Sequence, residues 1–94
     1  MKRWGRRLRH LAVGVLDIPQ DVVLEVPRIT MIGQLQMYIE NHRGVLHFTE
    51  SELRLLLTNG QLIVYGEQLV IRAILPEELL LEGRIGGVKY LQPQ

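Results

Sequence analysis

The residues of this chain that could do metal chemistry lie close together in one stretch, IENHRGVLHFTESE. His42 and His47 would meet across a turn, and Glu50 and Glu52 follow shortly after them. Imidazole and carboxylate groups bind zinc, but a zinc site needs several of them in fixed geometry, and the chain has no cysteine to assist. The segment ENHRG is explained as a turn, since asparagine and glycine both favour turn conformations. We therefore expect no metal site.

Other catalytic patterns are equally weak. Ser51 is the only serine and does not stand in a G-x-S-x-G turn. The glycines of EGRIGG lack the lysine of a phosphate-binding loop and the strand–helix context of a dinucleotide fold. Glu77 and Glu78 are adjacent acids after a proline, which is typical of a solvated turn. The sequence predicts no catalytic residue, no cofactor and no small-molecule substrate, so we expect a protein that is not an enzyme.

Charge is divided unevenly along the chain. Five of the first nine residues are Lys or Arg, and no acid occurs before Asp17. The rest of the chain holds six Lys or Arg residues and all ten Asp and Glu residues. The overall net charge of +1 therefore conceals a basic start and an acidic body.

Residues 1–18 have the pattern of an amphipathic helix. At 100° per residue, the apolar side chains fall on one arc and the basic side chains on the opposite arc, and Pro19 ends the pattern. Gly5 and Gly14 weaken such a helix, so it needs a surface on which to lie. The residues expected to contact a membrane or a partner are Lys2, Arg3, Trp4, Arg6, Arg7, Leu8, Arg9, Leu11 and Val15.

Three surfaces could receive this helix. A basic face opposite a Trp and Leu face is typical of a helix lying on an anionic membrane, with Trp4 at headgroup level. The same stripe could instead pack on its own domain, or fit a groove on a partner protein, as in a soluble adaptor. Nucleic acid is not expected, because the body is acidic and lacks interleaved aromatic and basic residues. The sequence predicts neither a transmembrane span nor a signal peptide.

The remaining chain predicts an all-β domain over residues 28–94, after a linker at residues 19–27. Short runs of alternating apolar and polar residues, separated by turn residues, predict eight strands: RITMIG, QLQMYIE, GVLHF, ELRLLLT, QLIVYG, QLVIRAIL, ELLLEGRI and VKYL. We expect a small antiparallel β-meander that forms a sandwich or roll. A short β-solenoid is the alternative, although no fixed repeat period is present.

Two predicted hairpin turns select one apolar face. Asn59-Gly60 suits a type I′ turn that pairs Leu57 with Leu62, and Gly66-Glu67 suits a type II′ turn that pairs Val64 with Leu69. Both turns place the same set on one face: Leu53, Leu55, Leu57, Leu62, Val64, Leu69 and Ile71. The agreement of two independent turns favours a meander.

The other face and the sheet edges raise the question of self-association. That face is too apolar to be fully solvated, because it carries Arg54, Leu56, Ile63, Tyr65, Val70 and Arg72. Strand proteins usually protect their edges with Lys or Pro, yet the body has one lysine, Lys89, and no proline between Pro27 and Pro76. Either the chain ends fold over the edges, or the edges serve self-assembly, which makes a homo-oligomer the expectation.

Most of the chain resembles the YabP/YqfC family of sporulation proteins, and within it the YqfC branch. The resemblance is carried by PRITMIGQLQMYIENHRG, LRLLLTNGQLIVYG and ILPEELLLEGRI, together with the basic, Trp-containing start. It implies a protein of endospore-forming bacteria, made in the mother cell during sporulation and needed for efficient spore formation. It also implies partnership with YqfD, a membrane-associated sporulation protein. Together with the basic start, this leads us to expect a peripheral protein in the mother-cell cytoplasm, at the membrane that surrounds the forespore. No site residues follow from the resemblance.

Overall fold

The computed structural model describes residues 26–93, which form six β-strands. The strands are β1 (Arg28–Ile32), β2 (Gln36–Glu40), β3 (Gly44–Phe48), β4 (Glu52–Leu57), β5 (Gly60–Leu75) and β6 (Glu78–Leu91). They form one antiparallel sheet in the order β1-β2-β6-β5-β4-β3. β3 to β6 are a meander, and the β1–β2 hairpin adds to it beside β6.

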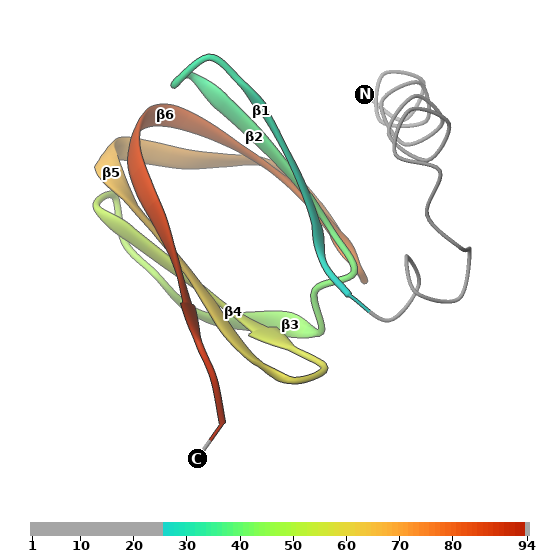
Figure 1. Ribbon diagram of the computed structural model, residues 1–94. Helices are drawn as coiled ribbons and strands as arrows, with labels where there is room; N and C mark the ends of the chain where they lie inside the picture. Colours follow the sequence, from blue (N-terminus) through green and yellow to red (C-terminus); the bar gives the residue numbers. More distant parts are fainter. Residues whose placement is uncertain (1–25, 94) are drawn as a thin grey trace.

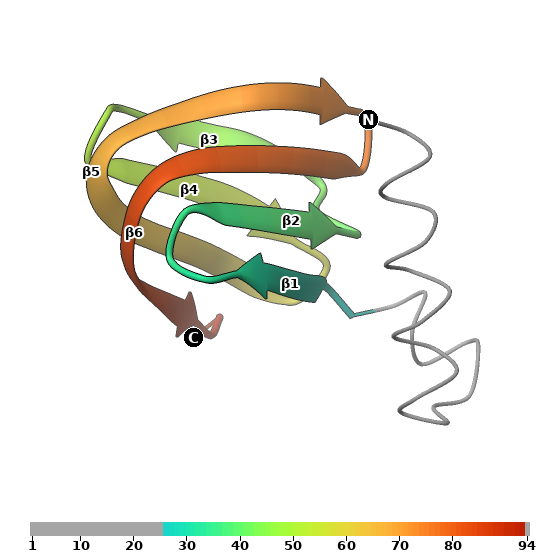
Figure 2. The same cartoon turned by 90° about the horizontal axis from the view of Figure 1, so that it is seen from above.

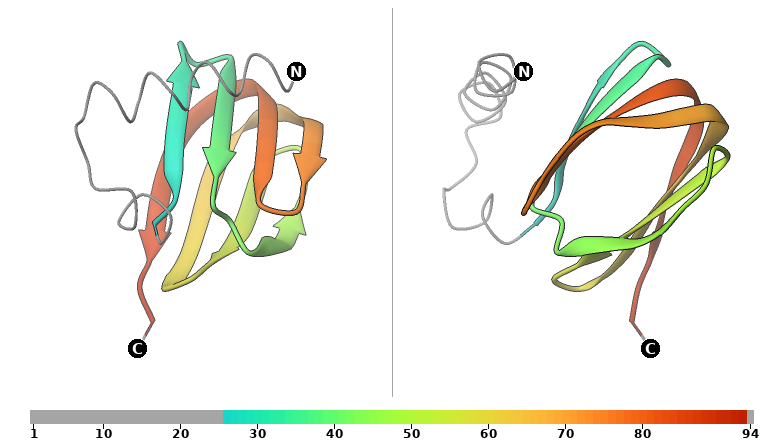
Figure 3. Two further views of the ribbon diagram at one scale, coloured as in Figure 1. Left: turned by 90° about the vertical axis from the view of Figure 1, so that its right-hand side faces the viewer. Right: turned by 180° about the vertical axis from the view of Figure 1, so that it is seen from behind.

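The sheet bends so that its two halves face each other, as Figures 1 and 3 show. β5 has 16 residues and β6 has 14, and both run through the bend (Figure 2). The first half-sheet contains β1, β2, the start of β6 and the end of β5. The second half-sheet contains β3, β4, the start of β5 and the end of β6.

Local irregularities in the β5–β6 ladder produce the bend. The pairing shifts register between Tyr65 and Gly66 and again between Glu67 and Val70. Such bulges increase twist and turn a strand sharply. Gln68 takes a φ of 54° and Gly83, across the ladder, a φ of 141°. Glycine reaches this region without steric cost, and both irregularities fall where the two halves separate.

The two short hairpins contact the bend in the same way. The Ile85 amide donates to the Gln34 carbonyl at 2.8 Å, so the β1–β2 turn is tied to β6. The Leu69 amide donates to the Glu50 carbonyl at 2.8 Å, so the β3–β4 turn is tied to β5. These backbone hydrogen bonds satisfy polar groups that the bulges leave without a strand partner.

The core lies between the two half-sheets. Along β4, Leu53 and Leu55 are fully buried, whereas Leu56 is 41% exposed on the outer face. This alternation follows from the two-residue period of a strand. The core cluster consists of Met37, Ile39, Leu53, Leu55, Leu57, Leu62, Val64, Leu69, Leu79, Leu81 and Ile85.

The all-β prediction is confirmed, and the boundaries of several strands are corrected. QLIVYG and QLVIRAIL form one strand, β5, so the predicted turn at Gly66-Glu67 is wrong. ELLLEGRI and VKYL likewise form β6, which continues through Gly86-Gly87. All neighbouring strands are antiparallel, so the sheet is not a stacked solenoid. The helix predicted over residues 1–18 lies outside the described residues.

The β4–β5 hairpin has the predicted inner face but a shifted register. Leu57 pairs with Gly60 and Leu55 with Leu62, so Thr58 and Asn59 make the turn. The prediction had paired Leu57 with Leu62. A shift of two residues keeps every side chain on its predicted face, because the strand period is two.

Candidate functional site

The predicted contact residues between Lys2 and Val15 lie outside the described residues. Any site that can be placed in space therefore lies on the β domain. No helix within residues 26–93 is long and apolar enough to cross a membrane. The candidates on the β domain are its histidine-containing turn, its polar clusters and its sheet edges.

The two histidines have different environments. His42 is 1% exposed, and its Nδ1 accepts a hydrogen bond from the Gly44 amide at 3.0 Å. His47 is exposed on β3 and pairs with Arg54 of β4. Across residues 26–93, no three His, Cys, Asp or Glu residues are grouped so that they could hold a metal ion. His42 thus stabilises the turn between β2 and β3, as a local acceptor for its backbone.

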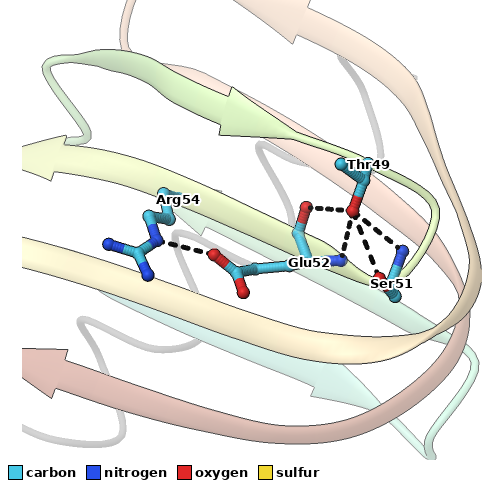
Figure 4. Close-up of polar contacts among 4 residues, drawn as sticks. All are labelled: Thr49, Ser51, Glu52 and Arg54. Atoms are coloured by element: carbon cyan, nitrogen blue, oxygen red, sulfur yellow. Dashed lines mark hydrogen bonds and ion pairs between the residues drawn. The ribbon is translucent and has the colours of Figure 1, made fainter.

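Ser51 and Glu52 belong to a turn network, drawn in Figure 4. The Thr49 hydroxyl oxygen accepts from the amides of Ser51 at 3.2 Å and Glu52 at 3.1 Å. Arg54 Nε donates to Glu52 Oε2 at 2.6 Å. This hydrogen bond, together with the negative charge of the Glu52 carboxylate, raises the pKa of Arg54. The network holds the β3–β4 turn together, and the Gly66 amide, which donates to the Ser51 carbonyl at 3.0 Å, ties that turn to the bend. Its polar groups have structural partners within the turn.

A second polar cluster joins three strands on the outer face. Glu82 of β6 accepts from Arg72 Nε at 2.7 Å and from Gln36 Nε2 at 2.8 Å. Both hydrogen bonds lower the pKa of Glu82, and the one from Arg72 has the larger effect. A shallow, open cavity of about 460 Å³ adjoins the cluster, lined by Ile32, Leu35, Gln36, Gln68, Glu82, Gly83 and Arg84. Because Glu82 already accepts two hydrogen bonds, it serves as a cross-link between β2, β5 and β6.

Four stretches of strand have a described neighbour on one side only. They are β1, β3, residues 70–75 of β5 and residues 86–91 of β6. Open edges offer backbone amides and carbonyls to another strand, and most proteins protect them with charge, proline or irregular backbone. Each edge can therefore be ranked by its protection.

Three of the edges are protected. β1 follows Pro27 and begins with Arg28. The β5 stretch contains Arg72 and a bulge and ends before Pro76. The β6 stretch contains Gly-Gly and then Lys89. Arginine and lysine at an edge disfavour pairing with another strand, since the strand would have to accommodate their charge and bulk.

The edge of β3 carries neither charge nor proline. Its sequence, GVLHF, contains no Lys, Arg, Asp, Glu or Pro. Val45, Leu46 and Phe48 are 38%, 48% and 39% exposed. A single bulge lies between Val45 and His47. This edge, residues 44–48, is the candidate interaction surface of the described domain. The scarcity of lysine and proline in the body is visible in the sequence, but only the order of strands in the sheet determines which strand lies at an edge.

Comparison with known proteins identifies the family. The model of the YabP family matches residues 24–94. The chain is 53% identical over 92 residues to a Bacillus subtilis (strain 168) protein named "Uncharacterized protein YqfC", covering 98% of this chain and 91% of that protein. No solved structure matches the chain. The resemblance carried by the sequence motifs is thus confirmed, and the chain belongs to the YabP family.

Proposed function

We propose that this chain is a non-enzymatic accessory protein of sporulation that acts at a membrane surface in the mother cell. The observation that carries the proposal is the basic start of a chain from this family: five Lys or Arg residues and Trp4 within the first nine positions. In the proposal, residues 2–18 lie on the anionic membrane surrounding the forespore. The β domain then holds further copies or a membrane-associated partner of the YqfD type.

The ion pairs of the β domain support this division of roles. Each arginine within residues 26–93 lies within 3.6 Å of a carboxylate oxygen. For example, Arg43 Nη1 lies 3.0 Å from Glu77 Oε2, and Arg72 Nε lies 2.7 Å from Glu82 Oε1. Carboxylates beside these arginines offset their attraction to an anionic surface. The attraction to lipid is therefore assigned to the basic start.

The expected strength of attachment is modest. Each basic residue near an anionic leaflet contributes about 1 kcal/mol, so five contribute at most about 5 kcal/mol before screening by salt. One copy would bind weakly and reversibly. Several copies joined through their β domains would bind far more firmly, because the second attachment is intramolecular. Self-association thus belongs to the proposed mechanism.

Sedimentation with liposomes tests the membrane role. Wild type is expected to sediment with vesicles containing anionic lipid at low salt and to dissociate as salt rises to about 0.5 M. The variant Trp4→Glu with Arg6→Glu should remain in the supernatant. Its matched control is Tyr90→Glu with Arg84→Glu, which makes the same charge change at exposed positions of β6 and should sediment like wild type.

Three outcomes would contradict the proposal. Wild type could ignore anionic vesicles at low salt, or the Trp4 and Arg6 variant could bind as well as wild type. Attachment that persists in high salt and does not need anionic lipid would instead favour the adaptor hypothesis, in which the apolar stripe of residues 1–18 fits a groove on a partner protein.

A further inference from the structure

We propose that the outer face of the first half-sheet binds residues 1–18 of the same chain, and that an anionic membrane competes with this face for them. Docking of this kind deepens the proposed function and rests on it for its biological meaning, since it would regulate the segment that attaches to the membrane. The centre of the face is formed by Tyr38 of β2 and Leu80 of β6, both of which are buried.

The register places Tyr38 and Leu80 on the outer side of the sheet. They pair with each other, and the next pair along the same strands, Met37 and Leu81, belongs to the core cluster. Successive side chains of a strand point to opposite faces, so Tyr38 and Leu80 point away from the core. They are nevertheless only 7% and 3% exposed.

The adjacent strands give these two side chains little cover. Thr30 of β1 lies beside Tyr38, and Ala73 of β5 lies beside Leu80. Within the described domain, the row that crosses this face is therefore two large side chains flanked by two short ones. Short neighbours leave the outer side of a central pair open to a covering segment.

The outer face of the second half-sheet is built differently. Ile63 is 2% exposed there, but it lies between Arg54 and Lys89, whose long aliphatic stems can cover apolar surface. Leu56, further along the same face, is 41% exposed. Long neighbours thus account for the burial of Ile63, whereas the burial on the first half-sheet calls for a further segment of chain.

The charge of the face names that segment. The charged side chains on its four strand segments are Arg28, Glu40, Arg72, Glu78 and Glu82. Carboxylates therefore outnumber guanidinium groups, and Glu40 is only 4% exposed. A buried carboxylate is stabilised by nearby positive charge. Residues 1–18 combine an apolar arc with five Lys or Arg residues, so they match both the apolar centre and the acidic surround.

The position of Val26 makes the docking possible within one chain. Val26 precedes β1, the edge strand of the first half-sheet, and its carbonyl accepts from Asn41 Nδ2 at 3.0 Å, directly after β2 ends. Residues 19–25 separate Val26 from the predicted helix and span at most about 25 Å when extended. The four strands of the half-sheet are about 14 Å across, from the first to the last. Residues 1–18 can therefore reach Tyr38 and Leu80.

The sheet face and the membrane cannot hold residues 1–18 at the same time. Docking on the sheet and insertion among lipid headgroups both use the apolar arc that contains Trp4 and Leu8. In the free protein the face covers this arc, and an anionic membrane displaces it. The apparent affinity for the membrane is then reduced in proportion to the fraction of molecules in which the arc is free.

Fluorescence of the full-length protein without lipid tests the docking. Trp4 is the only tryptophan of the chain, so quenching by acrylamide reports the exposure of residues 1–18. Wild type is expected to shield Trp4 equally at all protein concentrations. Leu80→Lys places a charge at the centre of the face and should remove the shielding. Leu56→Lys adds the same charge on the outer face of the second half-sheet and should leave Trp4 shielded.

A second variant separates docking from folding. Ala73→Lys keeps Leu80 and places a long, positive side chain beside it, so it should also release Trp4 while circular dichroism shows an intact β domain. A wild type that does not shield Trp4, or a folded Ala73→Lys variant that still shields it, would overturn the docking. Shielding that falls on dilution would assign the face to a second copy and overturn the inference as well.

Binding to anionic vesicles tests the competition. Leu80→Lys should bind more tightly than Leu56→Lys, which carries the same added charge, and the gain reaches about tenfold if about 90% of the molecules are docked. Equal affinities of the two variants would overturn the competition. Release of Trp4 by Leu80→Lys, with no vesicle binding by any of the proteins, would contradict the membrane role alone. Vesicle binding by a wild type with unshielded Trp4 would contradict the docking alone.

Discussion

The backbone of Gly66 lies so close to the Arg84 carbonyl that no side chain fits between them. A β-carbon placed at Gly66 would lie 2.2 Å from the Arg84 carbonyl oxygen and 2.8 Å from the Leu69 side chain. This approach occurs where β5 and β6 bend together. The bend brings the two half-sheets face to face, so the core depends on a glycine at this position.

Gly66→Ala should therefore destabilise the fold. Because the nearest obstacle is backbone rather than a flexible side chain, both strands must shift, and we expect a loss of roughly 2–4 kcal/mol in the free energy of unfolding. Gly87→Ala is the control, since a β-carbon there would meet no atom within 4 Å. It should change the free energy by about 0.5 kcal/mol or less. Urea unfolding of the two variants measures the difference, and equal effects would refute this account of the bend.

Adjacent leucines of β4 test the assignment of the core. Leu55 is fully buried and Leu56 is 41% exposed on the outer face. Leu55→Ala should cost about 2–5 kcal/mol of unfolding free energy, through lost burial and the cavity left behind. Leu56→Ala should cost about 1 kcal/mol or less. The midpoint of urea unfolding gives both values, and a larger effect at Leu56 would mean that the faces of β4 are reversed.

The Glu82 cross-link predicts a pH dependence of stability. Hydrogen bonds from Arg72 and Gln36 lower the folded-state pKa of Glu82. A lowered pKa gives stability that is present above the unfolded-state pKa and is lost as pH falls through the folded-state pKa. Wild type should therefore lose more stability between neutral and acid pH than Glu82→Gln. Urea unfolding across this pH range makes the comparison.

Arg72→Gln provides a second arm of the same experiment. It removes the main cause of the lowered pKa while keeping the Glu82 carboxylate. Its acid sensitivity should also fall below that of wild type. Parallel stability–pH curves for wild type and both variants would show that the cross-link contributes nothing to acid sensitivity.

Sequence periodicity was sufficient for the all-β class and for the inner face of β4 and β5. Leu53, Leu55, Leu57, Leu62, Val64 and Leu69 were assigned to one face and are buried. The predicted inner face is correct although the predicted turn position is wrong, because the pairing is shifted by two residues and the strand period is also two. Local alternation therefore carries information about burial even where the pairing is shifted.

The long strands could not be predicted from local pattern. Gly66-Glu67 has the composition of a hairpin turn, but in the structure β5 bends there and continues, still paired with β6. The decisive contact, between Gly66 and Arg84, joins residues far apart in sequence. The exposed edge of β3 was missed for the same reason, since an edge is defined by the order of strands in space. The predicted contacts of residues 2–15 lie outside the described residues and stay predictions.

The most direct test of the central claim is the position of the protein in sporulating cells. A fluorescent fusion of wild type is expected to concentrate at the membrane around the forespore. The variant Trp4→Glu with Arg6→Glu should spread through the mother cell, while Tyr90→Glu with Arg84→Glu should remain at that membrane. Equal enrichment of the Trp4 and Arg6 variant would contradict the claim that the basic start attaches this protein to a membrane.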